Sequence, residues 1–303
     1  MTKLLLLASL LMPALAQAAP TQTARPLPAR PARPLTIGVT LHPYYSWVAN
    51  IIAGTDAKVV AVVPGDVDAS NYQPRPQDIA TLAKVDALVI NGIGHDDFIG
   101  AMLKASGNTH VKVIKPNDGT PLMPGAHGEA VNPHTFLSFT NAIQQTYAIA
   151  RALGALRPEL AARFSANAHA YARKLRKIKA AAAAKLVSPR VTRVVTVHDG
   201  YSYLLQEFGI ELAGVVQPAH GLNPSAGELQ TLIDLMKREK LRVVLTEESF
   251  PKPLLRTLQQ ATGAKVYVIS HIATGTYSAG EFEEGMQHNV DTLVRALSDE
   301  GGE

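Results

Sequence analysis

The sequence of 303 residues contains no cysteine. Disulfide bonds are therefore excluded, and so is every metal site built from thiolates. If the chain binds a metal ion, the protein ligands must come from histidine, aspartate and glutamate, with water completing the coordination.

Charged residues are also few. They make up 18% of the chain, the net charge is only +4 at pH 7, and lysine and arginine are spread without a basic block. A nucleic-acid partner is not expected, because such binders gather their basic residues on one face. The phosphate-cradling pattern GxxxxGK and the zincin pattern HExxH are both absent from the sequence.

The N-terminus has the pattern of an export signal. Lys3 precedes the apolar run Leu4–Leu15, and the small-x-small sequence Ala16–Ala18 follows. We therefore expect a signal peptide at residues 1–18 and a soluble protein in the periplasm. The run is shorter than the roughly 20 residues of a membrane-spanning helix, and without cysteine we expect no lipid anchor. Residues 19–34 are rich in proline and arginine and predict a leader outside the fold.

Short runs rich in β-branched residues alternate with helix-compatible segments from residue 35 onward. Nearly continuous apolar runs are typical of parallel strands that are buried on both faces. The runs form two sets of four: 35–40, 58–63, 86–90 and 111–114, then 193–197, 211–216, 242–246 and 265–269. The pattern predicts an α/β protein with two lobes, each a four-stranded parallel sheet flanked by helices.

A long helix is predicted between the two sets of strands. Residues 157–186 contain no glycine, and Pro158, their one proline, stands where a helix starts. Alanine, leucine, lysine and arginine, all strong helix formers, dominate the stretch. We predict an N-terminal lobe at residues 35–156, a linking backbone helix at 157–187 and a C-terminal lobe at 188–303.

Histidines are concentrated after the predicted strands. Seven of the ten histidines follow a strand or lie in the loop after it: His42, His95, His127, His134, His198, His220 and His271. Ligands of open α/β sheets bind at the carboxyl ends of the strands, so two facing lobes would bring these residues to one cleft. Since imidazole is the commonest neutral metal ligand, the pattern predicts a metal site. The others, His110, His169 and His288, are expected at the surface.

Several motifs together resemble the periplasmic solute-binding proteins of zinc and manganese ABC importers (cluster A-I). They include the turn Val63–Gly65, the segment Tyr72–Pro76, and the sequences Asn91–Gly94, Asn132–His134 and Val197–Asp199. The resemblance covers residues 36–298. It implies two α/β lobes joined by one backbone helix, with a metal ion held between lobes that close little.

The resemblance also implies four metal ligands, of which this sequence matches two. His134 corresponds to the histidine of an Asp-Pro-His motif, and His198 to the histidine after the fifth strand. Ser70 stands where the family has a histidine, and Ser270 where it has an acidic residue. A serine hydroxyl is a poor zinc ligand, so both positions need a replacement.

We predict that other residues near these two serines complete the site. The predicted ligands are His95, His134, His198 and His271, with Asp68, Asp96 and Asp97 as alternatives to His95, and with His127 as an accessory residue. Glu247 and Glu248 follow the seventh strand. They either orient a ligating imidazole or cap the next helix.

Imidazoles without a thiolate suit Zn²⁺, and also Cu²⁺ or Ni²⁺, whereas Mn²⁺ prefers carboxylate and water. We therefore predict a monomeric, non-enzymatic protein that captures Zn(II) as cargo and delivers it to an inner-membrane ABC permease. One alternative is a protein that binds a metal chelate or metallophore. Another is a zinc-dependent hydrolase, and a third is an adhesion or chaperone factor whose metal site has decayed.

Overall fold

Two four-stranded parallel sheets form the framework of the protein in a computed structural model, which describes residues 33–125, 130–217 and 222–298. The first sheet has the order β2-β1-β3-β4 and the second β6-β5-β7-β8. The strands are β1 (Thr36–Val39), β2 (Lys58–Ala61), β3 (Ala87–Val89), β4 (Lys112–Ile114), β5 (Arg193–Thr196), β6 (Glu211–Val215), β7 (Val243–Thr246) and β8 (Lys265–Val268). The predicted fold class is confirmed.

Strand order places a crevice at the same point of each sheet. In the first sheet Ile37 of β1 lies between Val59 of β2 and Ala87 of β3. From β1 the chain crosses to β2 on one side and then returns to β3 on the other side, so the strand order switches at β1. The second sheet repeats this order around β5. In such sheets, side chains that follow the central strands come together at the carboxyl edge.

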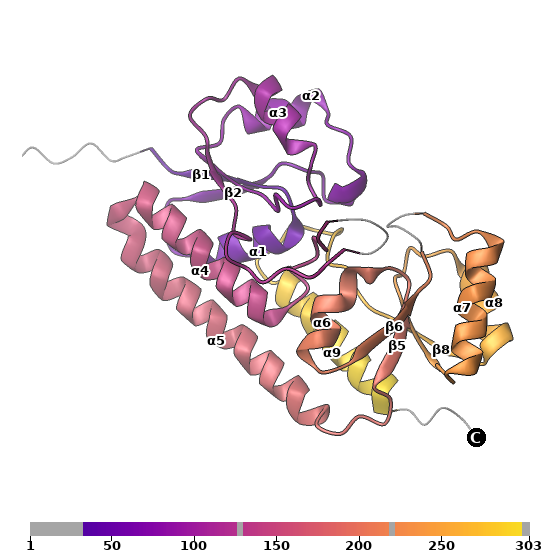
Figure 1. Ribbon diagram of the computed structural model, residues 1–303. Helices are drawn as coiled ribbons and strands as arrows, with labels where there is room; N and C mark the ends of the chain where they lie inside the picture. The colour runs from indigo at the N-terminus through magenta and orange to yellow at the C-terminus, as the bar shows by residue number, and fades with distance from the viewer. Residues whose placement is uncertain (1–32, 126–129, 218–221, 299–303) are drawn as a thin grey trace, which may run out of the picture. The chain divides into compact units, whose positions relative to one another are not determined.

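Helices connect the strands and cover the sheets (Figure 1). The α-helices are α1 (His42–Ile51), α2 (Pro76–Leu82), α3 (Ile99–Ser106), α4 (Phe139–Leu156), α5 (Ala161–Lys185), α6 (Ser202–Glu207), α7 (Ala226–Arg238), α8 (Lys252–Thr262) and α9 (Glu281–Ser298). Short 3-10 turns lie at η1 (Ala69–Asn71), η2 (Pro158–Leu160) and η3 (Asp199–Tyr201). Proline occupies the first turn of α1, α2 and η2, where its missing N–H has no helical partner.

The long helix between the sheets begins later than the sequence predicts. Pro158 starts the 3-10 turn η2, and α5 itself runs from Ala161 to Lys185, about 38 Å at 1.5 Å per residue. Its buried positions, Phe164, Ala168, Tyr171, Ala172, Leu175 and Ala182, recur at helical spacing. This stripe packs against α4, which runs antiparallel beside α5, and against α1 and α9 (Figure 1). Helix α5 therefore contacts helices associated with both sheets.

One continuous hydrophobic core joins the two sheets. It includes Val39 of β1, Trp47 of α1, Leu175 of α5, Leu245 of β7 and Phe282 of α9, each at most 1% exposed. Two smaller cores fill the other faces, one around Val244 and one around Leu88. Because close-packed interiors resist deformation, the shared core holds the two sheets in a fixed relation.

Glu207 at the end of α6 caps helix α4 across the lobes. Its carboxylate accepts hydrogen bonds from the backbone N–H groups of Phe139 and Thr140, both at 2.8 Å. The Nζ atom of Lys179 in α5 lies 2.8 Å from the same carboxylate, which is only 5% exposed. A carboxylate at a helix N-terminus satisfies orphan donors and opposes the helix dipole.

We expect Glu207→Ala to lower the free energy of unfolding by about 2–4 kcal/mol, because the N–H groups of Phe139 and Thr140 lose a charged acceptor and Lys179 loses its anionic partner. Urea unfolding of the metal-free protein measures the change. Glu159→Ala is the matched control, because its ion pair with Arg157 is exposed and is expected to contribute little. Equal effects of the two substitutions would contradict the capping role.

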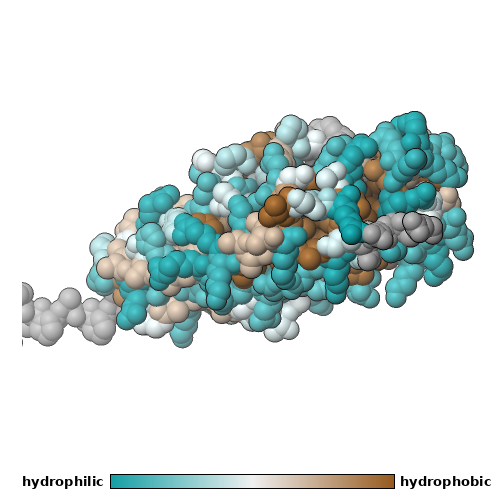
Figure 2. Space-filling view, turned by 90° about the horizontal axis from the view of Figure 1, so that it is seen from below, coloured by the Kyte–Doolittle hydropathy of each residue, from teal (hydrophilic) through white to brown (hydrophobic). Residues whose placement is uncertain are grey.

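Hydrophilic residues predominate on the face seen in Figure 2, with hydrophobic residues between them. Large hydrophobic side chains that are at least 36% exposed are few in the described ranges: Leu122, Leu156, Val187, Leu222 and Val268. Among the helices of the described residues, none combines the length and the apolar character needed to cross a membrane.

Candidate metal centre

Four buried histidines from four different loops meet between the two sheets. His95 follows β3, His134 lies between β4 and α4, His198 follows β5, and His271 follows β8. Their exposed fractions are 2%, 3%, 2% and 6%. The ring centroids of neighbouring pairs are 4.9–5.6 Å apart, from His134–His271 and His198–His271 at 4.9 Å to His95–His271 at 5.6 Å. The structure thus brings together all four histidines that the sequence predicts as ligands.

The donor atoms of these rings form two overlapping groups. One donor each from His95, His134 and His271 lie within 4.8 Å of one another, and so do donors from His198, Glu247 and His271. His271 belongs to both groups and links them. Bound to one zinc ion, such donors lie roughly 3–4 Å apart, so each group of three is close to the spacing that one ion requires.

His134 is oriented by Asn132 of the same motif. The Nδ1 atom of His134 lies 2.8 Å from Oδ1 of Asn132, whose amide nitrogen donates to the carbonyl of Asp199 at 2.9 Å. The Tyr203 hydroxyl donates to the Asn132 carbonyl at 2.9 Å. With Nδ1–H donating to Asn132, the lone pair of His134 is on Nε2.

His198 is fixed by its own turn. The backbone N–H of Gly200 donates to Nδ1 of His198 at 2.9 Å, which makes His198 the N-cap of η3. A Cβ atom at position 200 would lie 2.4 Å from Cε1 of His198 and 3.1 Å from Cδ2 of His134. Only glycine therefore fits between these two rings.

Glu247 contacts the opposite side of the His198 ring. Its Oε1 lies 2.7 Å from Nε2 of His198 and accepts a hydrogen bond from the Tyr201 hydroxyl at 2.9 Å. Burial favours a neutral carboxyl, but the hydrogen bond from His198 and the charges of His271 and His198 outweigh burial and lower the pKa of Glu247 to about 2. Glu247 is therefore an anion at neutral pH. Of the two interpretations open for Glu247, the geometry favours orientation of an imidazole, because α8 begins only at Lys252; Glu248 is exposed.

Asp68 supplies a second carboxylate from the loop after β2. Its Oδ1 lies 3.7 Å from Nε2 of His95, and its Oδ2 lies 3.4 Å from Nδ1 of His271. Burial lowers the pKa of His271, but the hydrogen bond to Asp68 and the charges of Glu247, Asp68 and Asp199 outweigh it, so that the pKa is raised. Ser70, at the position of the missing histidine, donates to Oδ1 of Asp68 through its hydroxyl at 2.8 Å.

The other two alternatives to His95 lie elsewhere. Asp96 accepts hydrogen bonds from the Thr40 hydroxyl at 2.6 Å and from the N–H groups of Asn91 and Gly92 at 2.7 and 2.8 Å. It therefore shapes the loop that carries His95. Asp97 is exposed.

The remaining histidines lie outside the two donor groups or outside the described residues. His42 is buried and stacks on Tyr277 with 3.9 Å between ring centroids. His110, His169 and His288 are exposed, as predicted. His127 and His220 lie outside the described residues, as does the predicted signal peptide.

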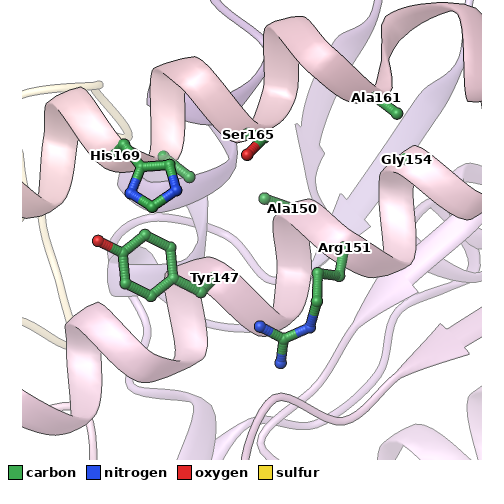
Figure 3. A pocket seen from close by; sticks show the side chains of 8 residues that line it. Tyr147, Ala150, Arg151, Gly154, Ala161, Ser165 and His169 are labelled. Atoms are coloured by element: carbon green, nitrogen blue, oxygen red, sulfur yellow. The ribbon is translucent and has the colours of Figure 1, made fainter.

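A cavity of about 490 Å³ lies between α4 and α5 (Figure 3). Tyr147 and His169 face each other there at 4.9 Å between ring centroids, with Arg151 at the side. The other lining residues are Ala150, Gly154, Ala161, Ser165 and Ala168. With an arginine, one imidazole and no carboxylate in its lining, this cavity lacks the donor set of a cation site.

Two of the partners that orient the rings, Asn132 and Gly200, are not predicted as such from the sequence. A signal was available for both, because each lies two residues from a predicted ligand, within reach of a local side-chain to backbone hydrogen bond.

Comparison with known proteins identifies the relatives of this chain. The family described as "ZnuA: Zinc-uptake complex component A periplasmic" matches residues 37–296. Two similar solved structures are of the SBP FpvC from Pseudomonas aeruginosa. The complex with Ni²⁺ is 44% identical and has a TM-score of 0.83; the match includes 89% of this chain and 99% of the FpvC chain. The complex with Mn²⁺ is 44% identical and has a TM-score of 0.82; the match includes 88% of this chain and 98% of the FpvC chain.

A curated relative is the zinc-binding lipoprotein AdcA of Streptococcus pneumoniae. It is 26% identical over 284 residues, which are 88% of this chain and 56% of the relative. The chain thus spans about half the length of that relative.

Proposed function

Since the chain belongs to the family of the periplasmic A component of zinc-uptake complexes, we propose that it captures a divalent metal ion outside the cytoplasm and delivers it to an ABC permease. The observation that supports this most is the meeting of four imidazoles, each 2–6% exposed, at the carboxyl ends of strands from both sheets. The proposed ligands are His95, His134, His198 and His271.

Charge balance supports a divalent cation as the cargo. Four neutral imidazoles leave the charge of the ion uncompensated, and a buried uncompensated charge is unfavourable. The carboxylates of Glu247 and Asp68, which lie against the rings of His198, His95 and His271, supply two negative charges. Either carboxylate is also close enough to complete the coordination of an ion that prefers more than four ligands.

The arrangement favours a bare ion over a chelate. A metallophore brings its own ligands and needs an open cleft, whereas the rings of these histidines lie 4.9–5.6 Å apart and face one another. A hydrolase needs an open position for water beside a base in addition to the metal ligands. Glu247, the carboxylate nearest to that role, is held by His198 and Tyr201, and its pKa of about 2 makes it a weak base.

We propose Zn(II) as the cargo, with Ni(II) as the next candidate. Imidazole ligands suit late first-row metals, and affinity for nitrogen and oxygen sites rises from Mn²⁺ toward Cu²⁺. The 44% identical relative has complexes with Ni²⁺ and with Mn²⁺, so the metals are expected to differ in affinity, without strict exclusion of Mn²⁺. In this proposal residues 1–18 direct export and 19–34 form a leader. Lobes 35–156 and 188–303, joined by 157–187, hold the ion in a monomer without enzymatic activity.

Competition between metals tests the proposal. Metal-free protein is equilibrated with equal amounts of Zn²⁺, Ni²⁺ and Mn²⁺, and the bound metal is measured by mass spectrometry. We expect one ion per chain, with Zn²⁺ and Ni²⁺ bound at least about 100-fold more tightly than Mn²⁺, as expected for imidazole ligands. Binding of Mn²⁺ as tight as that of Zn²⁺ would contradict the proposed cargo, and binding of no metal would contradict the proposed function.

A further inference from the structure

The backbone turn that carries His271 has an unusual conformation. β8 ends at Val268, and Ser270, His271 and Ile272 follow. Ile272 has φ 55°, in the left-handed region, which is unfavourable for a β-branched residue. Such a conformation costs on the order of 1–3 kcal/mol and persists only where its surroundings enforce it.

Asn289 of α9 holds one side of this turn. Its Oδ1 accepts a hydrogen bond from the N–H of Ser270 at 2.6 Å, and its Nδ2 donates to the Ser270 carbonyl at 2.8 Å. The Asn289 side chain is 0% exposed. Both polar groups of a fully buried amide are thus directed at the backbone of a single residue.

The hydroxyl of Ser270 closes the turn itself. Its Oγ accepts a hydrogen bond from the N–H of Ile272 at 3.1 Å, a local contact that offers the backbone an alternative to regular structure. After His271, Ile272 is 3% exposed and packs on α9 at Gly285. The contact is close, because a Cβ atom at position 285 would lie only 2.9 Å from Cγ1 of Ile272. The turn is therefore held before, within and after His271.

We propose that Ser270 and Asn289 are positioning residues that hold this strained turn so that His271 faces the metal. The inference rests on the proposed function, because His271 is the residue common to both donor groups. It also gives the serine a role. At the position where the resemblance implies an acidic ligand, Ser270 shapes the turn, and the metal-binding group is the next residue along the chain.

Ser270→Ala and Ser270→Thr form a matched pair for the test. Alanine removes the acceptor for the Ile272 N–H, whereas threonine keeps it. We expect Ser270→Ala to weaken Zn²⁺ binding by about 10–100-fold, as loss of a group that orients a ligand does, and Ser270→Thr to retain affinity. Asn289→Asp, which keeps the acceptor but loses the donor to the Ser270 carbonyl, is a second variant with the same expected direction.

A double-substitution cycle separates positioning from general destabilisation. In a chain that already carries His271→Ala, adding Ser270→Ala is expected to leave Zn²⁺ affinity unchanged, because the ligand that it positions is gone. The Co²⁺ absorption spectrum of Ser270→Ala should resemble that of His271→Ala.

Two results would overturn the positioning role while the proposed function stands. One is unchanged Zn²⁺ affinity in both Ser270→Ala and Asn289→Asp. The other is an equal loss from Ser270→Ala with and without His271. A wild-type chain that binds no Zn²⁺ would instead overturn the proposed function and the positioning role with it.

Discussion

Replacing His134 or His198 by alanine is expected to weaken Zn²⁺ binding by more than the 10–100-fold that loss of an orienting group typically costs, at least about 100-fold. Both rings are 2–3% exposed, and both have Nδ1 engaged, by Asn132 in one case and by the Gly200 N–H in the other. In His134 the lone pair for the metal is therefore on Nε2. In His198 Nε2 faces Oε1 of Glu247 at 2.7 Å, so metal binding at this ring requires loss of the proton that it shares with Glu247. Titration against a chelator of known affinity measures the loss.

His169→Ala is the control for these two variants. His169 lies exposed on α5 beside Tyr147, away from both donor groups. Its replacement is expected to leave Zn²⁺ affinity unchanged. Thermal unfolding of the metal-free variants shows whether they remain folded. Folded His134→Ala and His198→Ala proteins with wild-type affinity would refute the proposed ligand set.

Acid is expected to release the metal. Imidazoles bind metal only when deprotonated, so affinity falls once the pH drops below the imidazole pKa near 6.5. Because the pKa of His271 is raised, a proton remains on this ring at a pH where an ordinary histidine has lost it. Protons therefore compete with the metal for His271 at a higher pH than for an ordinary histidine. Between about pH 7.5 and pH 5 we expect Zn²⁺ affinity to fall by at least about 100-fold, since several ligands take up protons.

Glu247 allows the cause of this loss to be identified. Its pKa of about 2 keeps this carboxylate ionised throughout the same range, so Glu247 takes up no proton there and does not contribute to the loss of affinity. Measuring Zn²⁺ affinity at several pH values gives the number of protons released on binding, which we expect to exceed one. An affinity that does not change with pH would contradict an imidazole site.

The fold could be predicted from the sequence because its strands are distinctive. Runs such as Arg193–Val197 and Arg242–Thr246 are nearly all β-branched or apolar, and β5 and β7 lie within them. The first residue of the linking helix could not be predicted, because Pro158 fits both a helix start and the 3-10 turn that it forms. The pairing of α4 with α5 depends on tertiary packing and could not be predicted.

The candidate site could be predicted in part. The position of His95 and His271 after β3 and β8 was sufficient to group them with His134 and His198, since parallel strands bring their carboxyl ends to one edge. Two contacts could not be predicted, because they depend on tertiary packing. Glu247 after β7 contacts His198, and Asn289 of α9 accepts a hydrogen bond from the N–H of Ser270. The role of the four histidines as ligands stays a prediction.

Anomalous X-ray diffraction from crystals of the Zn²⁺-loaded protein tests the central claim most directly. We expect one zinc ion between the two sheets, with Nε2 of His134 and one ring nitrogen of His198 both about 2.0–2.1 Å from it. A zinc ion bound elsewhere, or one that contacts histidines of a single lobe only, would contradict capture of the ion between the lobes.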